Sequence, residues 1–107
     1  MNSNNNKVAI VTGGAKNIGR ATCIELAKLN YDIIIHANTD KKGAKETKTL
    51  VDEYNVNSRI IIGDLTDKNF ADDLVNEASK IGNLSVLVNN ASQRNFFKFV
   101  LFTFITI

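Results

Sequence analysis

The chain has 107 residues, of which 44% are apolar, and its 13 Lys and Arg against 11 Asp and Glu give a net charge of +2. This length allows one modest core and excludes a separate substrate domain, and the near-neutral charge gives no reason to expect nucleic acid as a partner. With one cysteine, Cys23, and one histidine, His36, the sequence excludes an intramolecular disulfide and a Cys/His metal site.

The predicted elements alternate between strands and helices along the chain. Short apolar runs rich in β-branched residues predict strands at residues 7–12, 32–36, 58–62 and 84–89. Between them, apolar residues at helical spacing predict helices at 18–29, 41–54 and 68–81. Caps for the second helix are offered by Asn38, Thr39 and Asp40, and caps for the third by Thr66 and Asp67.

Each predicted helix carries an apolar stripe that we expect to face the sheet. In the first helix the stripe consists of Ile18, Thr22, Leu26 and Leu29. In the second it consists of Ala44, Thr47, Val51 and Tyr54. In the third it consists of Phe70, Leu74, Ala78 and Ile81.

This alternation predicts an α/β fold with a parallel sheet covered by helices on both faces. Right-handed crossovers make it the N-terminal half of a doubly wound Rossmann sheet with strand order 3-2-1-4. We expect a disordered, Asn-rich N-terminus at residues 1–6, a partial dinucleotide-binding domain at 7–95 and an aberrant apolar tail at 96–107. Neither end resembles a signal peptide or a membrane-spanning helix, so we expect a cytoplasmic protein.

The turn after the first predicted strand has the composition of a phosphate-binding turn. It reads TGGAKNIG at residues 12–19 and leads directly into a predicted helix. Backbone N–H groups at a helix N-terminus suit a phosphate or pyrophosphate, and Gly19 lets the helix pack closely on the strand. A P-loop needs Lys and then Ser or Thr after its second glycine. Arg20 and Ala21 stand there instead, which excludes a P-loop.

Two motifs resemble those of the short-chain dehydrogenases/reductases. The turn at residues 12–19 is similar to their Thr-Gly-x-x-x-Gly-x-Gly signature, and NNAS at residues 89–92 is similar to their Asn-Asn-Ala-Gly. The local sequence resembles the pteridine reductases and the 3-oxoacyl-acyl-carrier-protein reductases. Asn17 stands where most members have a glycine, and Asn is the residue that best replaces glycine at left-handed backbone angles. Ser85 and Ser92 depart from the family's Asp and Gly.

The resemblance implies a nicotinamide dinucleotide bound by the turn and by the residues that follow the strands. The residues it implies in cofactor binding are Gly13, Lys16, Asn17, Ile18, Gly19, His36, Asn38, Thr39, Asp64, Leu65, Asn90, Ala91 and Ser92. Other interpretations stay open for three of them: a surface lysine for Lys16, a turn aspartate for Asp64 and a strand-end residue for His36. Cys23 is interpreted as filling a small gap in the core.

The end of the second strand favours NADP over NAD. An NAD site places a carboxylate there to bind the ribose 2′-hydroxyl, whereas this chain reads His36-Ala37-Asn38-Thr39. By the resemblance, Lys16 stands where NADP-dependent members carry a basic residue for the 2′-phosphate. The resemblance also implies that Asp64 accepts from the adenine amino group and that Leu65 flanks the ring.

The family's catalytic residues have no counterpart in this sequence. The resemblance implies a Tyr-x-x-x-Lys pair, with the tyrosine as general acid, and a serine that positions the carbonyl. Four residues after Tyr31 stands Ile35, and four after Tyr54 stands Ser58. We therefore expect no catalytic residue and an inactive chain, although the family consists of oxidoreductases that transfer hydride between a nicotinamide cofactor and a carbonyl or alcohol.

The tail at residues 96–107 reads FFKFVLFTFITI and is unlike the rest of the chain. It is too short to span a bilayer as a helix, and we interpret it as the product of a truncated copy of a longer enzyme. The alternatives are a non-catalytic nucleotide-binding module and a non-functional truncated product. The resemblance implies interface helices that this sequence lacks, so the oligomeric state stays open. We expect aggregation or chaperone binding, because the strand at 84–89 would have an unpaired apolar edge and the tail is apolar.

Overall fold

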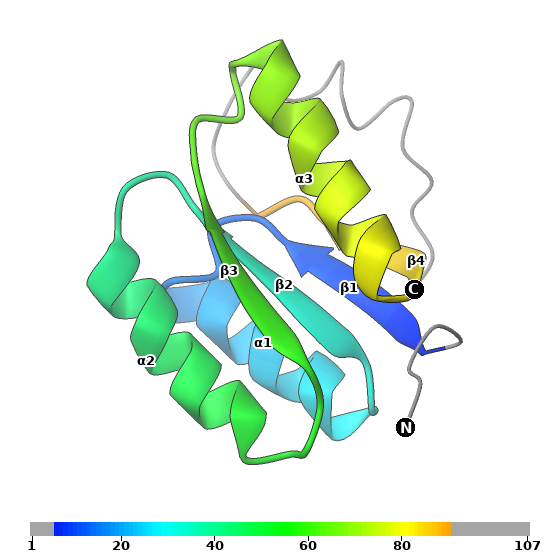
Figure 1. Ribbon diagram of the computed structural model, residues 1–107. Helices are drawn as coiled ribbons and strands as arrows, with labels where there is room; N and C mark the ends of the chain where they lie inside the picture. Colours follow the sequence, from blue (N-terminus) through cyan, green and yellow to red (C-terminus); the bar gives the residue numbers. More distant parts are fainter. Residues whose placement is uncertain (1–5, 91–107) are drawn as a thin grey trace.

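The computed structural model describes residues 6–90, which form a four-stranded sheet between helices (Figure 1). The elements in chain order are β1 (Lys7–Val11), α1 (Asn17–Lys28), β2 (Asp32–Ala37), α2 (Lys41–Asp52), β3 (Ser58–Ile62), α3 (Lys68–Ile81) and β4 (Asn83–Val88). Neighbouring strands are parallel, and their order is β3-β2-β1-β4. The predicted α/β fold and strand order are confirmed.

An apolar layer lies on each face of the sheet. On one face α1 and α2 cover side chains that include Val11 and Ile35, and on the other α3 covers Ile10 and Ile34. Successive residues of one strand thus reach opposite layers. This explains the near-continuous apolar sequence of β2, which is buried along its whole length. No helix of residues 6–90 is long and apolar enough to cross a membrane.

The predicted apolar stripe of α1 is wrong at its two ends, whereas Leu26 within it is partly buried against the core. Ile18 and Leu29 are 73% and 69% exposed, and the buried side consists of Gly19, Cys23 and Ala27. These three residues are spaced four apart and therefore share one face of the helix. All three are small, so the helix axis lies closer to the sheet than large aliphatic side chains would permit.

The other two helices follow their predicted patterns more closely. Ala44, Thr47 and Val51 are buried in α2, but Tyr54 lies beyond the end of that helix and is 39% exposed, which corrects its predicted place in the stripe. Asp40 caps α2 by accepting from the N–H of Gly43 at 2.8 Å. Asp67 caps α3 by accepting from the first backbone amides of that helix. In α3 the fully buried residues are Ala71, Leu74 and Ala78.

Asp32 ties together the amino ends of three strands. Its buried carboxylate accepts from the N–H of Asn57 at 2.9 Å, just before β3, and from the side-chain amide of Asn6 at 3.2 Å, just before β1. The carbonyl of Asn6 also accepts from the N–H of Asn83, at the start of β4. Asn6, the last residue of the predicted N-terminal segment, therefore already belongs to the fold.

Candidate functional site

The four strands end at the same edge of the sheet, where hydrogen bonds join residues far apart in the sequence. The carbonyl of Val88 accepts from the N–H of Thr12 at 3.1 Å. The Thr12 hydroxyl accepts from the N–H of Asn90 at 2.9 Å, and the Asn90 side-chain amide donates to the carbonyl of Gly13 at 3.1 Å. The motif after β4 therefore supports the turn after β1 directly.

His36 joins the ends of three strands. Its Nδ1 accepts from the N–H of Gly13 at 3.2 Å, so Nε2 carries the proton that is donated to the carbonyl of Gly63 at 2.9 Å. The residue is 2% exposed, and burial lowers the pKa of its imidazole. Both ring nitrogens are engaged within the protein. This placement favours the strand-end interpretation of His36 over contact between its side chain and a cofactor.

The turn between β1 and α1 has the backbone that its sequence predicts. Gly13 has a φ of 64° and Asn17 a φ of 55°, so Asn17 takes the left-handed conformation expected of a glycine substitute. A Cβ added at Gly19 would collide with the carbonyl oxygen of Gly13 and lie 2.8 Å from Nδ2 of Asn90. The close approach of helix and turn therefore requires glycine at this position.

The corner between the turn and β2 has an exposed lysine, and its first carboxylate is the one that caps α2. Lys16 is exposed at the N-cap of α1, and Asn38 and Thr39 are exposed after β2. Asp40 is the next acidic residue, but its Oδ1 is engaged in capping α2. An anion at this corner would therefore meet a cation and neutral polar groups, as predicted for a 2′-phosphate.

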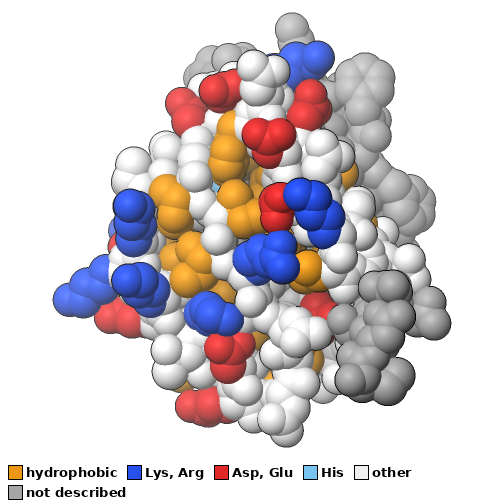
Figure 2. Space-filling view, viewed as in Figure 1, with side chains coloured by type: hydrophobic (Ala, Val, Ile, Leu, Met, Phe, Trp, Pro, Cys, Tyr) orange, Lys and Arg blue, Asp and Glu red, His pale blue; other side chains and the backbone are white. Residues whose placement is uncertain are grey.

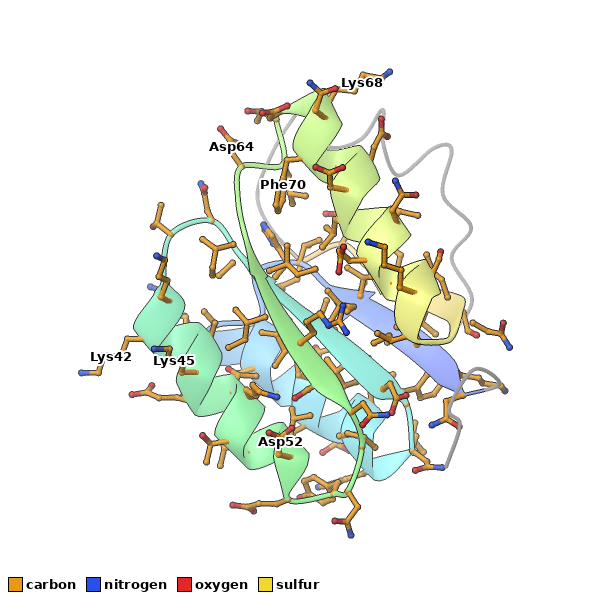
Figure 3. The ribbon with its side chains drawn as sticks, in the orientation of Figure 1. Lys42, Lys45, Asp52, Asp64, Lys68 and Phe70 are labelled. Carbon is orange, nitrogen blue, oxygen red and sulfur yellow. The ribbon has the colours of Figure 1, made fainter. Side chains whose placement is uncertain are left out.

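The carboxyl end of β3 carries the residues predicted to meet adenine (Figure 3). Asp64 is exposed, and its Oδ1 accepts from the N–H and hydroxyl of Thr66 at 2.9 and 2.8 Å, which lowers the pKa of the carboxyl. Its second oxygen makes no hydrogen bond within residues 6–90. Leu65 is only 4% exposed because it packs in the core beneath α3. Phe70 of α3 stacks at a tilt on His36, with ring centroids 5.8 Å apart.

The described residues end at Asn90, inside the NNAS motif of residues 89–92. Asn89 has a buried Oδ1 with no hydrogen-bond partner in the described part of the chain. Ala91, Ser92 and the tail at 96–107 lie outside the described residues. Ser85, the other departure from the family pattern, is the extra residue of an irregular register between β1 and β4. Its hydroxyl donates to a backbone carbonyl two residues earlier.

Three residues at this site escape prediction from sequence patterns. Arg20 and Thr47 donate to carbonyls of the turn, and Gly43 lets the backbone of α2 approach the turn. Thr47 stands in the predicted stripe of α2, but the stripe indicates only burial.

No group of three or more potential metal ligands occurs in residues 6–90. Cys23 fills the core as predicted, and burial raises the pKa of its thiol to about 12, so the group is unreactive.

Known proteins of one family share this arrangement. A family model described as short chain dehydrogenase matches residues 7–104. The uncharacterized oxidoreductase YhxC of Bacillus subtilis is 37% identical over 90 residues, which cover 83% of this chain and 32% of that protein. L-2,3-butanediol dehydrogenase of Corynebacterium glutamicum is 39% identical over 87 residues, covering 79% of this chain and 34% of that protein.

A solved structure agrees with the sequence comparisons. The crystal structure of acetoin dehydrogenase from Enterobacter cloacae matches with a TM-score of 0.74 and 34% identity, covering 81% of this chain and 35% of that one. The chain thus spans about a third of the length of the curated relatives it matches.

Proposed function

Because the chain belongs to the short-chain dehydrogenase family, we propose that it is the NADP(H)-binding portion of an oxidoreductase. An intact relative would transfer hydride between NADPH and a carbonyl or alcohol. The observation that carries this proposal is the joined edge of the sheet, where the residues after β1, β2 and β4 surround the N-terminus of α1. The turn suits a pyrophosphate because it leads into the N-terminus of α1, where backbone N–H groups favour an anion, and Gly19 allows the helix to start this close to the turn.

In this proposal the cofactor lies across the carboxyl edge of the sheet. The N–H groups from Asn17 to Gly19 bind the pyrophosphate, and Lys16 binds the 2′-phosphate with Asn38 and Thr39 beside it. Asp64 accepts from the adenine amino group, which the free oxygen of its carboxylate permits. Asn90 lines the adenosine, and the resemblance of the NNAS motif extends this role to Ala91 and Ser92.

The choice of NADP rests on charge. Lys16 has no ion pair among the salt bridges of residues 6–90, and Asp40 is held by the cap of α2. A 2′-phosphate would therefore find an ammonium group without an ion-pair partner in residues 6–90, and the first carboxylate after β2, Asp40, has one oxygen engaged in the cap. A 2′-hydroxyl would lack the acceptor that NAD sites supply.

The test compares affinities for the two cofactors. Lys16→Ala is expected to weaken NADPH binding about tenfold, the loss typical of one charge-assisted hydrogen bond, and to leave NADH binding unchanged. Asp64→Ala is expected to weaken both equally, because adenine is common to them. Lys42→Ala, which removes the same charge from the outer side of α2 (Figure 3), serves as the control. Equal affinity of the unmutated chain for NADPH and NADH would refute the assignment.

The chain alone is proposed to be inactive, since it supplies cofactor-binding residues without the family's Tyr-x-x-x-Lys pair. Purified chain mixed with NADPH and carbonyl substrates is expected to show no oxidation of NADPH in an absorbance assay. A rate that stays with the protein through purification and disappears in Lys16→Ala would contradict this expectation.

A further inference from the structure

Two side chains from outside the turn hold its backbone carbonyls. Thr47, in the middle of α2, donates from Oγ1 to the carbonyl of Gly14 at 2.8 Å in a buried bond. Arg20, in the first turns of α1, donates from Nη2 to the carbonyl of Ala15 at 2.6 Å. Arg20 Nε also donates to Thr47 Oγ1 at 3.0 Å. The Thr47 hydroxyl therefore accepts from α1 and donates to the turn.

Arg20 is itself fixed against α2. Its Nη2 also lies 3.2 Å from the carbonyl of Gly43 and 3.0 Å from Oε1 of Glu46. The guanidinium is planar and its donors are rigidly arranged, so these contacts leave it one orientation. Gly43 makes the approach possible, because a Cβ there would lie 2.7 Å from the carbonyl oxygen of Ala15.

These bonds decide which way two peptide groups of the turn face. In a planar trans peptide the carbonyl and the N–H point in opposite directions. The carbonyls of Gly14 and Ala15 are drawn toward Thr47 and Arg20, so the N–H groups of Ala15 and Lys16 point the other way. Neither N–H has an acceptor in the described part of the chain. The turn thus has two N–H groups without an acceptor in residues 6–90, and the second of them belongs to Lys16 itself.

We propose that Arg20 and Thr47 are positioning residues that set how strongly the chain selects NADP over NAD. The inference rests on the proposed function, in which Lys16 binds the 2′-phosphate. Without these bonds the carbonyls of Gly14 and Ala15 lose their side-chain partners. The Cα of Lys16, from which its side chain starts, is then held only by the backbone bonds on either side of it. The contact of Lys16 with a 2′-phosphate depends on where its Cα lies, whereas the contact of Asp64 with adenine does not. Removing the bonds should therefore weaken NADP binding selectively.

The experiment compares isosteric variants of the full chain at low micromolar concentration. Thr47→Val removes the hydroxyl and keeps the shape, and Thr47→Ser keeps the hydroxyl. Thr49→Val is the matched control, because the Thr49 hydroxyl donates only to a carbonyl of its own helix. Arg20→Gln is the second test variant, and Arg59→Gln removes the same charge from β3, where it pairs with α3.

Two measurements are made on each variant. Dissociation constants for NADPH and NADH come from titration of nicotinamide fluorescence, and hydrogen exchange of residues 14–18 comes from mass spectrometry. We expect Thr47→Val and Arg20→Gln to lower the NADPH preference about tenfold, as for one lost hydrogen bond to a charged group. Both variants should also exchange the amide of Gly14 faster, because this N–H, unlike those of Ala15 and Lys16, is protected by its bond to the carbonyl of His36. Thr47→Ser and the two controls should match the unmutated chain in both measurements.

The outcomes separate this inference from the proposed function. Equal weakening of both cofactors in Thr47→Val and Arg20→Gln would indicate a merely structural role and overturn the inference alone. An unchanged preference in these variants, with exchange of α3 and β4 showing an intact fold, would overturn it as well. No preference for NADPH in the unmutated chain would overturn the proposed function, and the inference with it.

Discussion

At the scale of single residues, His36 is the contact between the turn after β1 and the end of β3. Its neutral ring accepts from Gly13 and donates to Gly63. A protonated ring has no acceptor, so protonation would break the bond to the turn. Burial lowers the pKa of His36 below its ordinary value of 6.5, and it outweighs the Gly63 bond and the charge of Asp64, which act in the opposite direction.

The lowered pKa makes stability depend on pH in one direction. The unfolded chain takes up a proton on this residue at a higher pH than the folded chain does. His36 therefore makes its whole contribution to the free energy of unfolding at pH values above 6.5, the ordinary pKa of histidine. That contribution falls as the pH drops from there toward the lowered pKa, by up to about 1.4 kcal/mol per pH unit. Urea denaturation at a series of pH values measures this slope.

His36→Gln isolates this contribution, because His36 is the only histidine of the chain. Glutamine offers one acceptor and one donor and does not titrate. We expect the variant to show a shallower loss of stability than the unmutated chain just below neutral pH, where carboxylates stay ionised. Parallel slopes for the two proteins would exclude His36 as the source of the dependence.

At the scale of elements, the fully buried residues of α1 are small, whereas Ile24 and Leu26 are only partly buried and Ile18 is exposed. Cys23 is fully buried, and its Sγ would lie 3.2 Å from a Cβ added at Gly14. Cys23→Leu is therefore expected to destabilise the chain by about 1–3 kcal/mol through overpacking. Ile18→Ala is the control and is expected to change stability by less than about 0.5 kcal/mol, as for an exposed site. A larger loss in Ile18→Ala than in Cys23→Leu, measured by urea denaturation, would contradict this packing.

The element pattern explains what the sequence predicts and what it does not. The runs of β-branched residues predict the strands, and right-handed crossovers then leave few possible strand orders. In α1, the prediction assigns the buried face to large apolar residues. The turn between Gly13 and Gly19, however, sets the distance from the helix to the sheet. That distance selects Cys23 and Ala27 for the buried face.

Some features of the candidate site can also be predicted from the sequence, and others cannot. The left-handed conformation of Asn17 follows from its place in the motif. The bonds from Arg20 and Thr47 could not be predicted, because they depend on how α2 lies against the turn: Thr47 is 27 positions from Arg20 and 33 from Gly14. The burial of Leu65 likewise depends on α3, which covers it.

At the scale of the whole molecule, the two edges of the sheet differ in their surroundings. Figure 2 shows the β3 side, where apolar side chains are interrupted by lysines, arginines and acidic residues. Such charges protect an edge from pairing with other chains. β4 pairs with β1 on one side and with no strand of residues 6–90 on the other. It reads NLSVLV and contains no charge, so its edge is a template for association.

We therefore expect the full chain to self-associate when expressed alone. Residues 99–107 add an apolar segment without charge, proline or glycine, a composition typical of aggregation. Deletion of residues 96–107 should reduce association only partly, and Ser85→Lys combined with that deletion should reduce it further, because a lysine on an edge strand opposes pairing. Light scattering gives the particle size, and a monodisperse monomer of the full chain at tens of micromolar would contradict this expectation.

The central position of β1 also fixes the order in which the chain can assemble during synthesis. β1 is the first strand to leave the ribosome, but it lies between β2 and β4, and β4 is the last. The bond between Thr12 and Asn90 spans 78 positions. At a typical elongation rate of about 5–20 residues per second, one side of β1 stays open for several seconds. The nascent chain therefore completes the carboxyl edge of its sheet last, and the proposed cofactor has no complete edge to bind before residue 90 has emerged.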